Sequence, residues 1–206
     1  NGRAENDEVG AIHELPLRDC PGTPNSMVGI FLPAGTGGWS MGSSRKEIRS
    51  RMKRYEIRIA GFGGQGVVTI GKIVGLAAAL YDKKNAVQTQ SYGPESRGGA
   101  CKSEVVLSDG EIHYPKVRTA DVLVAPLTVI KEVPRTDVKV VKVPTAEIAL
   151  EVGNKKFQNM VALWALASLT GVISRGAFEK AIKDSVPPRT LGQNLEAFTK
   201  GNEYVR

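Results

Sequence analysis

A glycine-rich loop is the part of this 206-residue sequence best suited to binding a ligand. The run from Gly61 to Gly66 reads GFGGQG and fits the pattern G-x-G-x-x-G between an expected strand and an expected helix. Glycines permit a tight turn and a close approach of the backbone, and the first amides of the helix then favour an anion. A phosphate or pyrophosphate is the expected ligand, although glycines needed only for packing would give the same pattern.

A nicotinamide dinucleotide is a weaker match to this loop. Such sites hold the ribose hydroxyls with an acidic residue at the end of the second strand, about 20 residues further on. The corresponding stretch here runs from Val87 to Ser91 as VQTQS, and Asp82 falls in the turn before the expected strand. The loop therefore favours a phosphate-bearing ligand or a tight strand–helix junction over NAD.

A second polar loop, Gln90–Gly99, follows the carboxyl end of the next expected strand, where ligands bind in open α/β sheets. It places a hydroxyl, a phenol, a carboxylate and a guanidinium among glycine and proline residues. Arg97 could bind a phosphate or carboxylate through two parallel hydrogen bonds. Glu95 could instead pair with Arg97 and shape the loop, so a ligand site and a structural ion pair both stay open.

Residues for catalysis or metal binding are scarce. His13 and His113 are the only histidines, and the sequence offers no Ser-His-Asp or Cys-His group. The two cysteines, Cys20 and Cys101, form no CxxC pair, so we expect neither an iron–sulfur cluster nor a zinc site in this chain. Free thiols in a reducing cytoplasm are expected instead of a disulfide.

The composition is that of an ordinary globular protein with a basic surface: 41% of residues are hydrophobic, 24% are charged, and the net charge is +7. Such a surface could meet nucleic acid, a phosphorylated ligand or an acidic protein. Aromatic residues make up only 6%, and no basic–aromatic stripe offers a platform for bases, so we expect no nucleic acid partner. The longest apolar run, Met160–Leu169, is shorter than the about 20 residues needed to cross a bilayer, so no membrane association is expected either.

The elements expected to position the two loops alternate between strands and helices. Tyr55–Ala60 alternates apolar and polar residues as a strand does, and from Val67 the apolar residues recur with helical spacing. Further strands are expected at Ala86–Gln90, Cys101–Leu107, Val122–Ala125 and Val138–Val143, and further helices at Thr145–Val152, Asn159–Thr170, Arg175–Asp184 and Asn194–Lys200. A turn at Ser108–Gly110 predicts a hairpin into Glu111–Tyr114, and Thr145 is the expected N-cap of its helix. The pattern predicts an α/β fold, a Rossmann-like three-layer sandwich with a mixed sheet.

The first 51 residues differ from the rest of the chain. They contain eight glycines and four prolines with little periodicity, and such a segment buries too little to offset the entropy of ordering it. Met52 would be a natural start, because the first expected strand follows it directly. We therefore expect residues 1–51 to be a disordered or non-native extension and residues 52–206 to be the folded domain.

Four motifs together resemble the gamma subunit of 2-oxoacid:ferredoxin oxidoreductases. GFGGQGV at Gly61–Val67 and TQSYGPESRGGACKSEVVLSDGEIHYP at Thr89–Pro115 carry most of the resemblance. ADVLVA at Ala120–Ala125 and GNKKFQNMVALWALASLTG at Gly153–Gly171 are similar too. The second loop looks most like that of the 2-oxoglutarate-specific gamma chains, and the resemblance extends over Met52–Arg206.

The resemblance implies a subunit of a larger thiamine-dependent enzyme that oxidatively decarboxylates 2-oxoglutarate to succinyl-CoA and reduces ferredoxin. The alpha and beta chains would hold thiamine diphosphate, Mg²⁺ and iron–sulfur clusters, with a ferredoxin-like delta chain as a further candidate partner. This chain would then have no catalytic residue of its own and would aid coenzyme A binding or assembly. The residues expected to contact coenzyme A are Gly61, Gly63, Gly64, Gln65, Gly66, Ser91, Glu95 and Arg97.

Other functions stay open beside this one. The chain could be a purely structural subunit, or a homologue specific for pyruvate, 2-oxoisovalerate or indolepyruvate. A free-standing NAD-dependent dehydrogenase is disfavoured because the ribose-binding acid is missing and about 155 residues leave no room for a substrate domain.

One part of the expected fold is missing from the sequence. After Ala120–Ala125 the family continues through a helix and a further strand, whereas here Ala125–Val129 leads almost directly to the next strand-like segment. About one αβ unit, typically 20–30 residues, is therefore expected to be absent.

Overall fold

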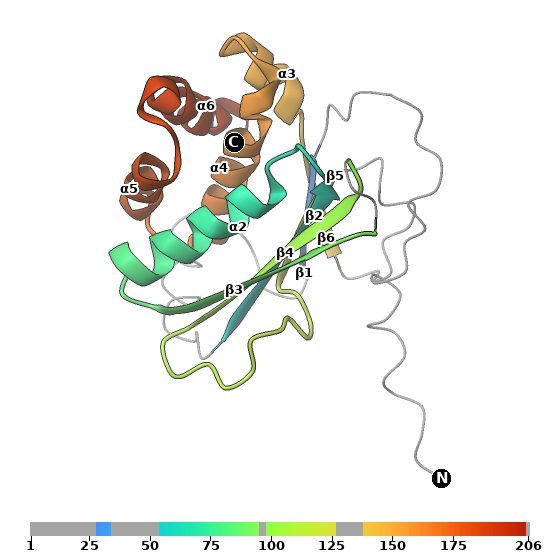
Figure 1. Ribbon diagram of the computed structural model, residues 1–206, viewed down its shortest axis with the longest axis vertical. Helices are drawn as coiled ribbons and strands as arrows, with labels where there is room; N and C mark the ends of the chain where they lie inside the picture. The colour runs from blue at the N-terminus through green and yellow to red at the C-terminus, as the bar shows by residue number, and fades with distance from the viewer. Residues whose placement is uncertain (1–27, 34–53, 95–97, 127–137, 205–206) are drawn as a thin grey trace.

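The computed structural model describes residues 28–33, 54–94, 98–126 and 138–204 of the chain. Six strands in these ranges form one sheet with the order β3-β4-β2-β5-β1-β6 (Figure 1). The strands are β1 (Val28–Pro33), β2 (Tyr55–Phe62), β3 (Asn85–Tyr92), β4 (Ala100–Ser108), β5 (Val122–Pro126) and β6 (Val138–Val143). Strand β2 pairs parallel with β5 and antiparallel with β4, so the predicted α/β class with a mixed sheet is confirmed.

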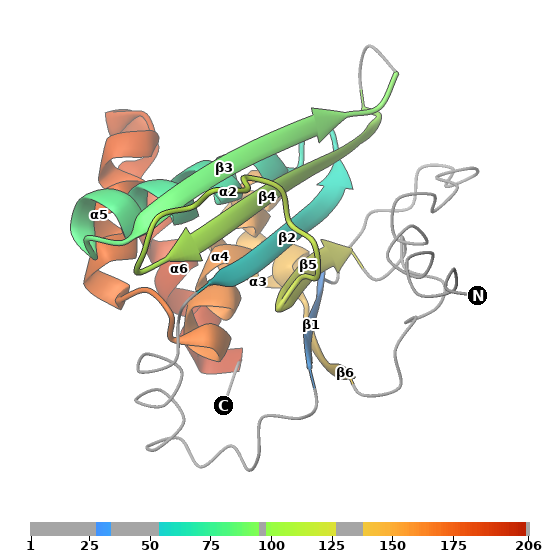
Figure 2. The same cartoon turned by 90° about the horizontal axis from the view of Figure 1, so that it is seen from below.

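The helices described by the structure lie on one face of this sheet (Figures 1 and 2). They are α2 (Val67–Leu76), which continues as a π-helical turn (Ala77–Tyr81), α3 (Thr145–Glu151), α4 (Gln158–Thr170), α5 (Arg175–Ser185) and α6 (Leu191–Tyr204). Helix α4 packs against α2, α3 and α6, and every residue from Met160 to Leu166 is buried. A helix that is apolar on all sides is stable only when it is enclosed in this way. Among the described residues, no helix is long and apolar enough to span a bilayer.

The described helices form a single layer, whereas the sequence predicted helices on both faces. The chain passes from β2 through α2 to β3, which lies toward one edge of the sheet. A right-handed crossover from β5 toward the other edge, where β6 lies, would place its helix on the opposite face. That unit is the one expected to be missing: β5 ends at Pro126, and the next described element is β6, which begins at Val138. The second helical layer is therefore not present among the described residues.

Strand β1 lies between β5 and β6 and pairs antiparallel with both. Ile30 is opposite Val124 of β5 on one side and opposite Val141 of β6 on the other. Val28–Pro33 lies within the range 1–51, for which a disordered or non-native extension was expected and no strand was predicted. That expectation stays a prediction, and the rest of the range lies outside the described residues. The run VGIFLP is too short to form a stable strand alone, and its hydrogen bonds to the strands on both edges stabilise it.

The face of the sheet opposite the helices is covered by residues 109–121 (Figure 2). Arg54 donates to the carbonyl oxygens of Tyr114 and Lys116, at 2.9 Å each. The Glu56 carboxylate accepts from the backbone N–H groups of Arg118 at 2.6 Å and Thr119 at 2.9 Å. The predicted hairpin strand Glu111–Tyr114 is wrong, because side chains near the start of β2 bind the backbone of this segment in place of a neighbouring strand.

Thr145 also differs from its prediction. The residue at the N-cap of α3 is Pro144, and Thr145 is the first residue of the helix. Its hydroxyl is buried without a hydrogen-bond partner among the described residues. The remaining predicted strands and helices differ from the observed ones by at most four residues at each end.

Helix α2 lies very close to β4 because residue 71 is a glycine. A Cβ at Gly71 would stand 2.0 Å from Oγ and 2.9 Å from Cβ of Ser103. The Ser103 hydroxyl is held in place by the side-chain amide of Gln88, whose Nε2 donates to it at 2.9 Å. One turn later, a Cβ at Gly75 would make only an ordinary contact, at 3.8 Å from Gln88.

We expect Gly71→Ala to lower the free energy of unfolding by about 1–3 kcal/mol, because overpacking must displace Ser103 or the helix. Gly75→Ala is the matched control in the same helix. It should raise the free energy of unfolding by about 0.5–1 kcal/mol, because alanine favours helix without a clash. Urea unfolding of both variants measures the difference, and equal effects would show that α2 does not rest on β4 as described.

Candidate functional site

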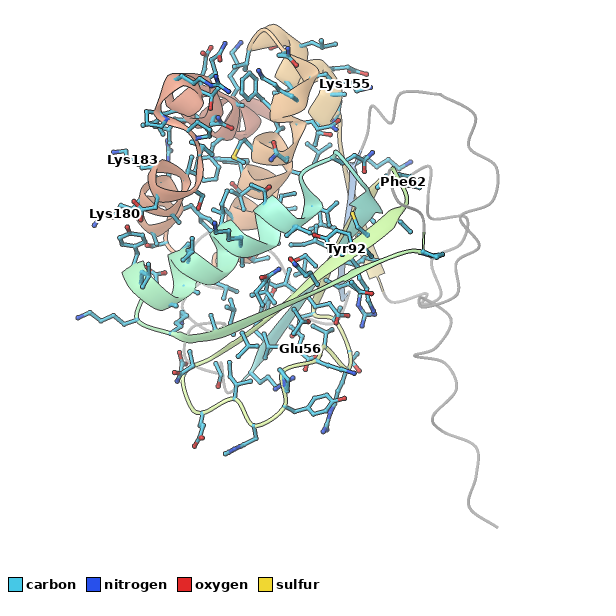
Figure 3. All side chains as sticks on the ribbon, in the orientation of Figure 1. Glu56, Phe62, Tyr92, Lys155, Lys180 and Lys183 are labelled. Carbon is cyan, nitrogen blue, oxygen red and sulfur yellow. The ribbon has the colours of Figure 1, made fainter. Side chains whose placement is uncertain are left out.

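The two candidate loops meet at one end of the sheet, beyond the carboxyl ends of β2 and β3. The backbone N–H of Gly63 donates to the carbonyl oxygen of Gly99 at 2.9 Å. A Cβ at Gly63 would lie 3.1 Å from the backbone nitrogen of Gly98, so the close approach requires a glycine there. Figure 3 shows Phe62 and Tyr92, which border the two loops, at the same end of the sheet.

The glycine loop forms the turn from β2 into α2. Gly64 and Gly66 have φ angles of 88° and 75°, in the left-handed region that favours glycine, and Gly66 is the N-cap of α2. Oε1 of Gln65 accepts from the backbone N–H of Phe62 at 2.9 Å. A Cβ at Gly61 would come within 2.7 Å of that same oxygen, so glycine at this position makes room for the Gln65 side chain. The Gln65 amide is thereby oriented with its Nε2 donors directed away from the bond to Phe62.

Not all of the predicted site residues come together. Ser91 is exposed in β3 opposite Lys102 of β4. Gln88, three positions earlier, lies on the face of the sheet that carries α2, because it bonds Ser103 beside Gly71. Since side chains alternate between faces along a strand, Ser91 points to the face opposite α2. Glu95 and Arg97 lie outside the described residues, and their predicted roles stay predictions.

A pocket of about 30 Å³ lies between the glycine loop and the first turn of α4. Its polar lining comes from Gln65 of the glycine loop and from Gln158 and Asn159 of α4, and the rest is apolar surface of β2, β5, α2 and α4. Gln158 and Asn159 were not among the predicted site residues. A polar pair at the start of an otherwise apolar helix was the signal that could have indicated them.

Asn159 brings α4 into contact with the glycine loop. A Cβ at Gly66 would stand 2.5 Å from Nδ2 of Asn159, so the loop and the amide are in close contact. Oδ1 of Asn159 accepts from the backbone N–H of Met160 at 3.0 Å, which fixes the orientation of the amide. The site thus lies at the start of α2, which favours an anion, and α4 adds the Asn159 side-chain amide to it.

Cys101 is the cysteine nearest to the two loops among the described residues. Cys101 lies in β4 beside the second loop, but burial raises the pKa of its thiol, which keeps the reactive thiolate form scarce. Among the residues that the structure describes, no group of three or more His, Cys, Asp or Glu side chains could hold a metal ion. The described part of the site offers backbone and amide donors around a small pocket.

Comparison with known sequences matches the chain to one family, described as pyruvate ferredoxin/flavodoxin oxidoreductase, over residues 56–127 and 125–204. The two matches meet after β5, where one αβ unit was expected to be missing. The 2-oxoglutarate synthase subunit KorC of Methanocaldococcus jannaschii is 46% identical, over 74% of this chain and 95% of the relative. That alignment spans 177 positions, whereas 74% of 206 residues is about 152, so about 25 positions have no counterpart here, which is the size of one αβ unit.

Two solved structures share the fold. The gamma subunit of a keto/oxoacid ferredoxin oxidoreductase from Geobacter sulfurreducens is 37% identical with a TM-score of 0.59, over 74% of this chain and 96% of that chain. A 2-oxoglutarate:ferredoxin oxidoreductase from Magnetococcus marinus, solved with 2-oxoglutarate, coenzyme A and succinyl-CoA bound, is 25% identical with a TM-score of 0.62. It is matched over 74% of this chain and 31% of its own chain.

Proposed function

Because the chain belongs to the pyruvate ferredoxin/flavodoxin oxidoreductase family, we propose that it serves as the gamma subunit of a 2-oxoglutarate:ferredoxin oxidoreductase. The complex would convert 2-oxoglutarate and coenzyme A to succinyl-CoA and CO₂ and pass the electrons to ferredoxin. The proposal for 2-oxoglutarate rests on the 46% identity to a 2-oxoglutarate synthase subunit over nearly that subunit's full length.

Within that complex we assign to this chain a part of the coenzyme A site. The observation that carries this role is the contact of Gly63 with Gly98 and Gly99, which joins the two loops at the start of α2. Coenzyme A has a pyrophosphate and a ribose phosphate, and backbone N–H groups at a helix start bind such groups well. Gly61, Gly63, Gly64, Gln65 and Gly66 would form the described part of this site, and Arg97 would add charge to it.

The partners proposed for this chain would supply the cofactors and the electron acceptor of the reaction. Alpha and beta subunits would hold thiamine diphosphate with Mg²⁺ and the iron–sulfur clusters, and ferredoxin, or a ferredoxin-like delta subunit, would accept the electrons. We place the complex in the cytoplasm, a reducing compartment in which a free thiol such as Cys101 persists.

We expect Gly63→Ala to weaken coenzyme A binding by the assembled complex about tenfold. The added methyl group would push the glycine loop away from Gly98, and the loss of one hydrogen bond to a charged group is worth about 1.5–3 kcal/mol. Titration of the complex with coenzyme A measures the affinity, and 2-oxoglutarate-dependent reduction of ferredoxin measures the activity.

Gly110→Ala is the matched control, because its Cβ would meet no atom closer than 4.0 Å and it lies in the turn after β4. It should bind coenzyme A like the unaltered complex. If Gly63→Ala also left the affinity unchanged, the loops would be structural and coenzyme A would bind elsewhere in the complex.

A further inference from the structure

Strand β3 is an edge of the sheet without the usual protection against pairing. Among the described strands it has one neighbour, β4, and both views of the fold show it as the outermost strand (Figures 1 and 2). Natural proteins block exposed edges with charges, prolines or bulges. The eight residues of β3, NAVQTQSY, contain no charge and no proline, and they pair with β4 one to one without a bulge. By contrast, β6 at the other edge has six residues, two of which are lysines.

The backbone groups on the free side of β3 follow from its pairing with β4. The backbone N–H of Gly93 donates to the carbonyl oxygen of Ala100 at 2.7 Å, so Gly93 directs its backbone groups toward β4. In an antiparallel pair these directions alternate from residue to residue. The residues that direct their N–H and C=O groups away from β4 are therefore Ala86, Gln88, Gln90 and Tyr92. Together they offer a regular ladder to a strand of another chain.

Exposed apolar side chains lie at both ends of this edge. Tyr92, the last residue of β3, is 61% exposed, and so is Leu80, in the π-helical turn that precedes the strand. Side chains alternate along a strand, so Tyr92 points to the same face as Gln88, which is the face that carries α2 and Leu80. An antiparallel second copy of β3 would bring the Tyr92 end of each strand to the Leu80 end of the other. The edge is therefore complementary to itself.

The charge of the chain points to the same segment. With a net charge of +7, two copies repel each other unless they meet through a neutral surface, and β3 supplies one. Lys84, which precedes the strand, is paired with Asp109, whose Oδ1 lies 3.1 Å from its Nζ. The end of the edge thus carries little uncompensated charge.

We infer that two copies of this chain associate through β3, antiparallel about a twofold axis, so that their six-stranded sheets form one continuous sheet. Engaging every outward-directed residue fixes the register. Ala86 then lies opposite Tyr92 of the second copy, Gln88 opposite Gln90, and Thr89 opposite Thr89. Because both copies use the same surface, the contact closes as a dimer. This inference goes beyond the proposed function and does not depend on coenzyme A.

Gln90→Pro tests the ladder, because it removes an outward N–H without breaking a hydrogen bond to β4. Gln90→Ala is the matched control, since it removes the same exposed side chain and keeps the N–H. Sedimentation equilibrium of the full-length chain should show a reversible monomer–dimer equilibrium. We expect Gln90→Pro to raise its dissociation constant at least about tenfold, because each dimer loses two hydrogen bonds, and Gln90→Ala to change it less than about threefold.

Cysteine cross-linking tests the register and leaves the backbone unchanged. In a Cys20→Ser/Cys101→Ala chain, Thr89→Cys would face its own counterpart across the axis, with about 4.5 Å between the Cα atoms, within reach of a disulfide. Val87→Cys is the matched control on the same face: it would lie opposite Ser91 and about 13 Å from its counterpart. Mild oxidation should therefore link two chains of the Thr89→Cys variant and not of the Val87→Cys variant.

Several results would overturn the inference. A chain that stays monomeric at high concentration, or a dimer that Gln90→Pro does not weaken, would show that β3 does not pair with a second copy. Equal weakening by Gln90→Ala would assign the contact to side chains, and cross-linking of both cysteine variants would contradict the register. If Gln90→Pro only prevents a monomeric chain from assembling with alpha and beta subunits, the edge binds a strand of a partner subunit instead. None of these results bears on coenzyme A binding, which Gly63→Ala tests separately.

Discussion

A chain that begins at Met52 is expected to lose most of its stability, whereas a chain that begins at Val28 should keep it. The shorter chain lacks β1, which pairs with β5 over Val28–Phe31 and with β6 over Val28–Pro33. Without β1, two strand edges open inside the sheet, and β6 loses its only neighbour among the described strands. At about 1 kcal/mol net per hydrogen bond, these two ladders are comparable with the about 5–15 kcal/mol that keeps a domain folded.

Urea unfolding followed by circular dichroism compares the two truncated chains with the full-length protein. A second variant, Ile30→Pro in the full-length chain, removes a ladder hydrogen bond without shortening the protein and should also destabilise it strongly. Should the chain from Met52 unfold at the same urea concentration as the full-length protein, β1 would contribute nothing and residues 52–206 would be a complete domain after all.

The strands and helices that could be predicted are those whose own residues show the apolar periodicity of a strand or a helix. Tyr55–Ala60 shows a period of two, and Arg175–Asp184 has the spacing of an amphipathic helix, so both were predicted within a few residues of their observed bounds. Strand β1 depends instead on two neighbours that are distant in sequence, and its glycine- and proline-rich surroundings indicate disorder. The failed hairpin at Glu111–Tyr114 has a similar cause, because Arg54 and Glu56 bind that segment from about 60 residues away.

In the candidate site, too, local features were predictable and long-range contacts were not. The turn at Gly61–Gly66 was predictable because its four glycines lie within six residues of sequence and the geometry is local. The contribution of Asn159 was not, since it depends on the packing of α4 against α2. The orientation of Ser91 was not predictable either. The alternation of side chains along β3 shows that Ser91 and Gln88 point to opposite faces, but only the contact of Gln88 with Ser103 shows which of these faces carries α2.

The two departures from the family pattern are linked in the structure. An αβ unit is missing after β5, and a strand from the N-terminal extension occupies the position between β5 and β6. The added strand runs antiparallel to both neighbours, so it restores the hydrogen bonding of the sheet without the crossover helix that a parallel strand would need. The face that such a helix would cover is the one on which residues 109–121 are held by charged side chains of β2.

The most deeply buried ion pair of β2 leads to the second large prediction. Arg58 of β2 and Glu104 of β4 are 4% and 6% exposed, and Nε of Arg58 lies 2.7 Å from Oε1 of Glu104. Nη2 of Arg58 also donates to the carbonyl oxygen of Val117 at 3.3 Å, which ties residues 109–121 to the pair. We expect Arg58→Met to lower the free energy of unfolding by about 3–5 kcal/mol, because it leaves a carboxylate buried without its main partner.

The double variant Arg58→Met/Glu104→Leu should recover most of that loss, since an apolar pair of similar volume needs no compensating charge. Arg175→Met is the control: its pair with Glu179 is 54% and 40% exposed on α5, and its loss should cost at most about 0.5 kcal/mol. Urea unfolding of the single and double variants gives a coupling energy, expected to exceed about 2 kcal/mol. A coupling near zero would mean that the carboxylate of Glu104 is stabilised by other groups, of which Lys102, with Nζ at 3.7 Å, is the nearest. Segment 109–121 would then be held by Arg54 and Glu56 without help from the buried pair.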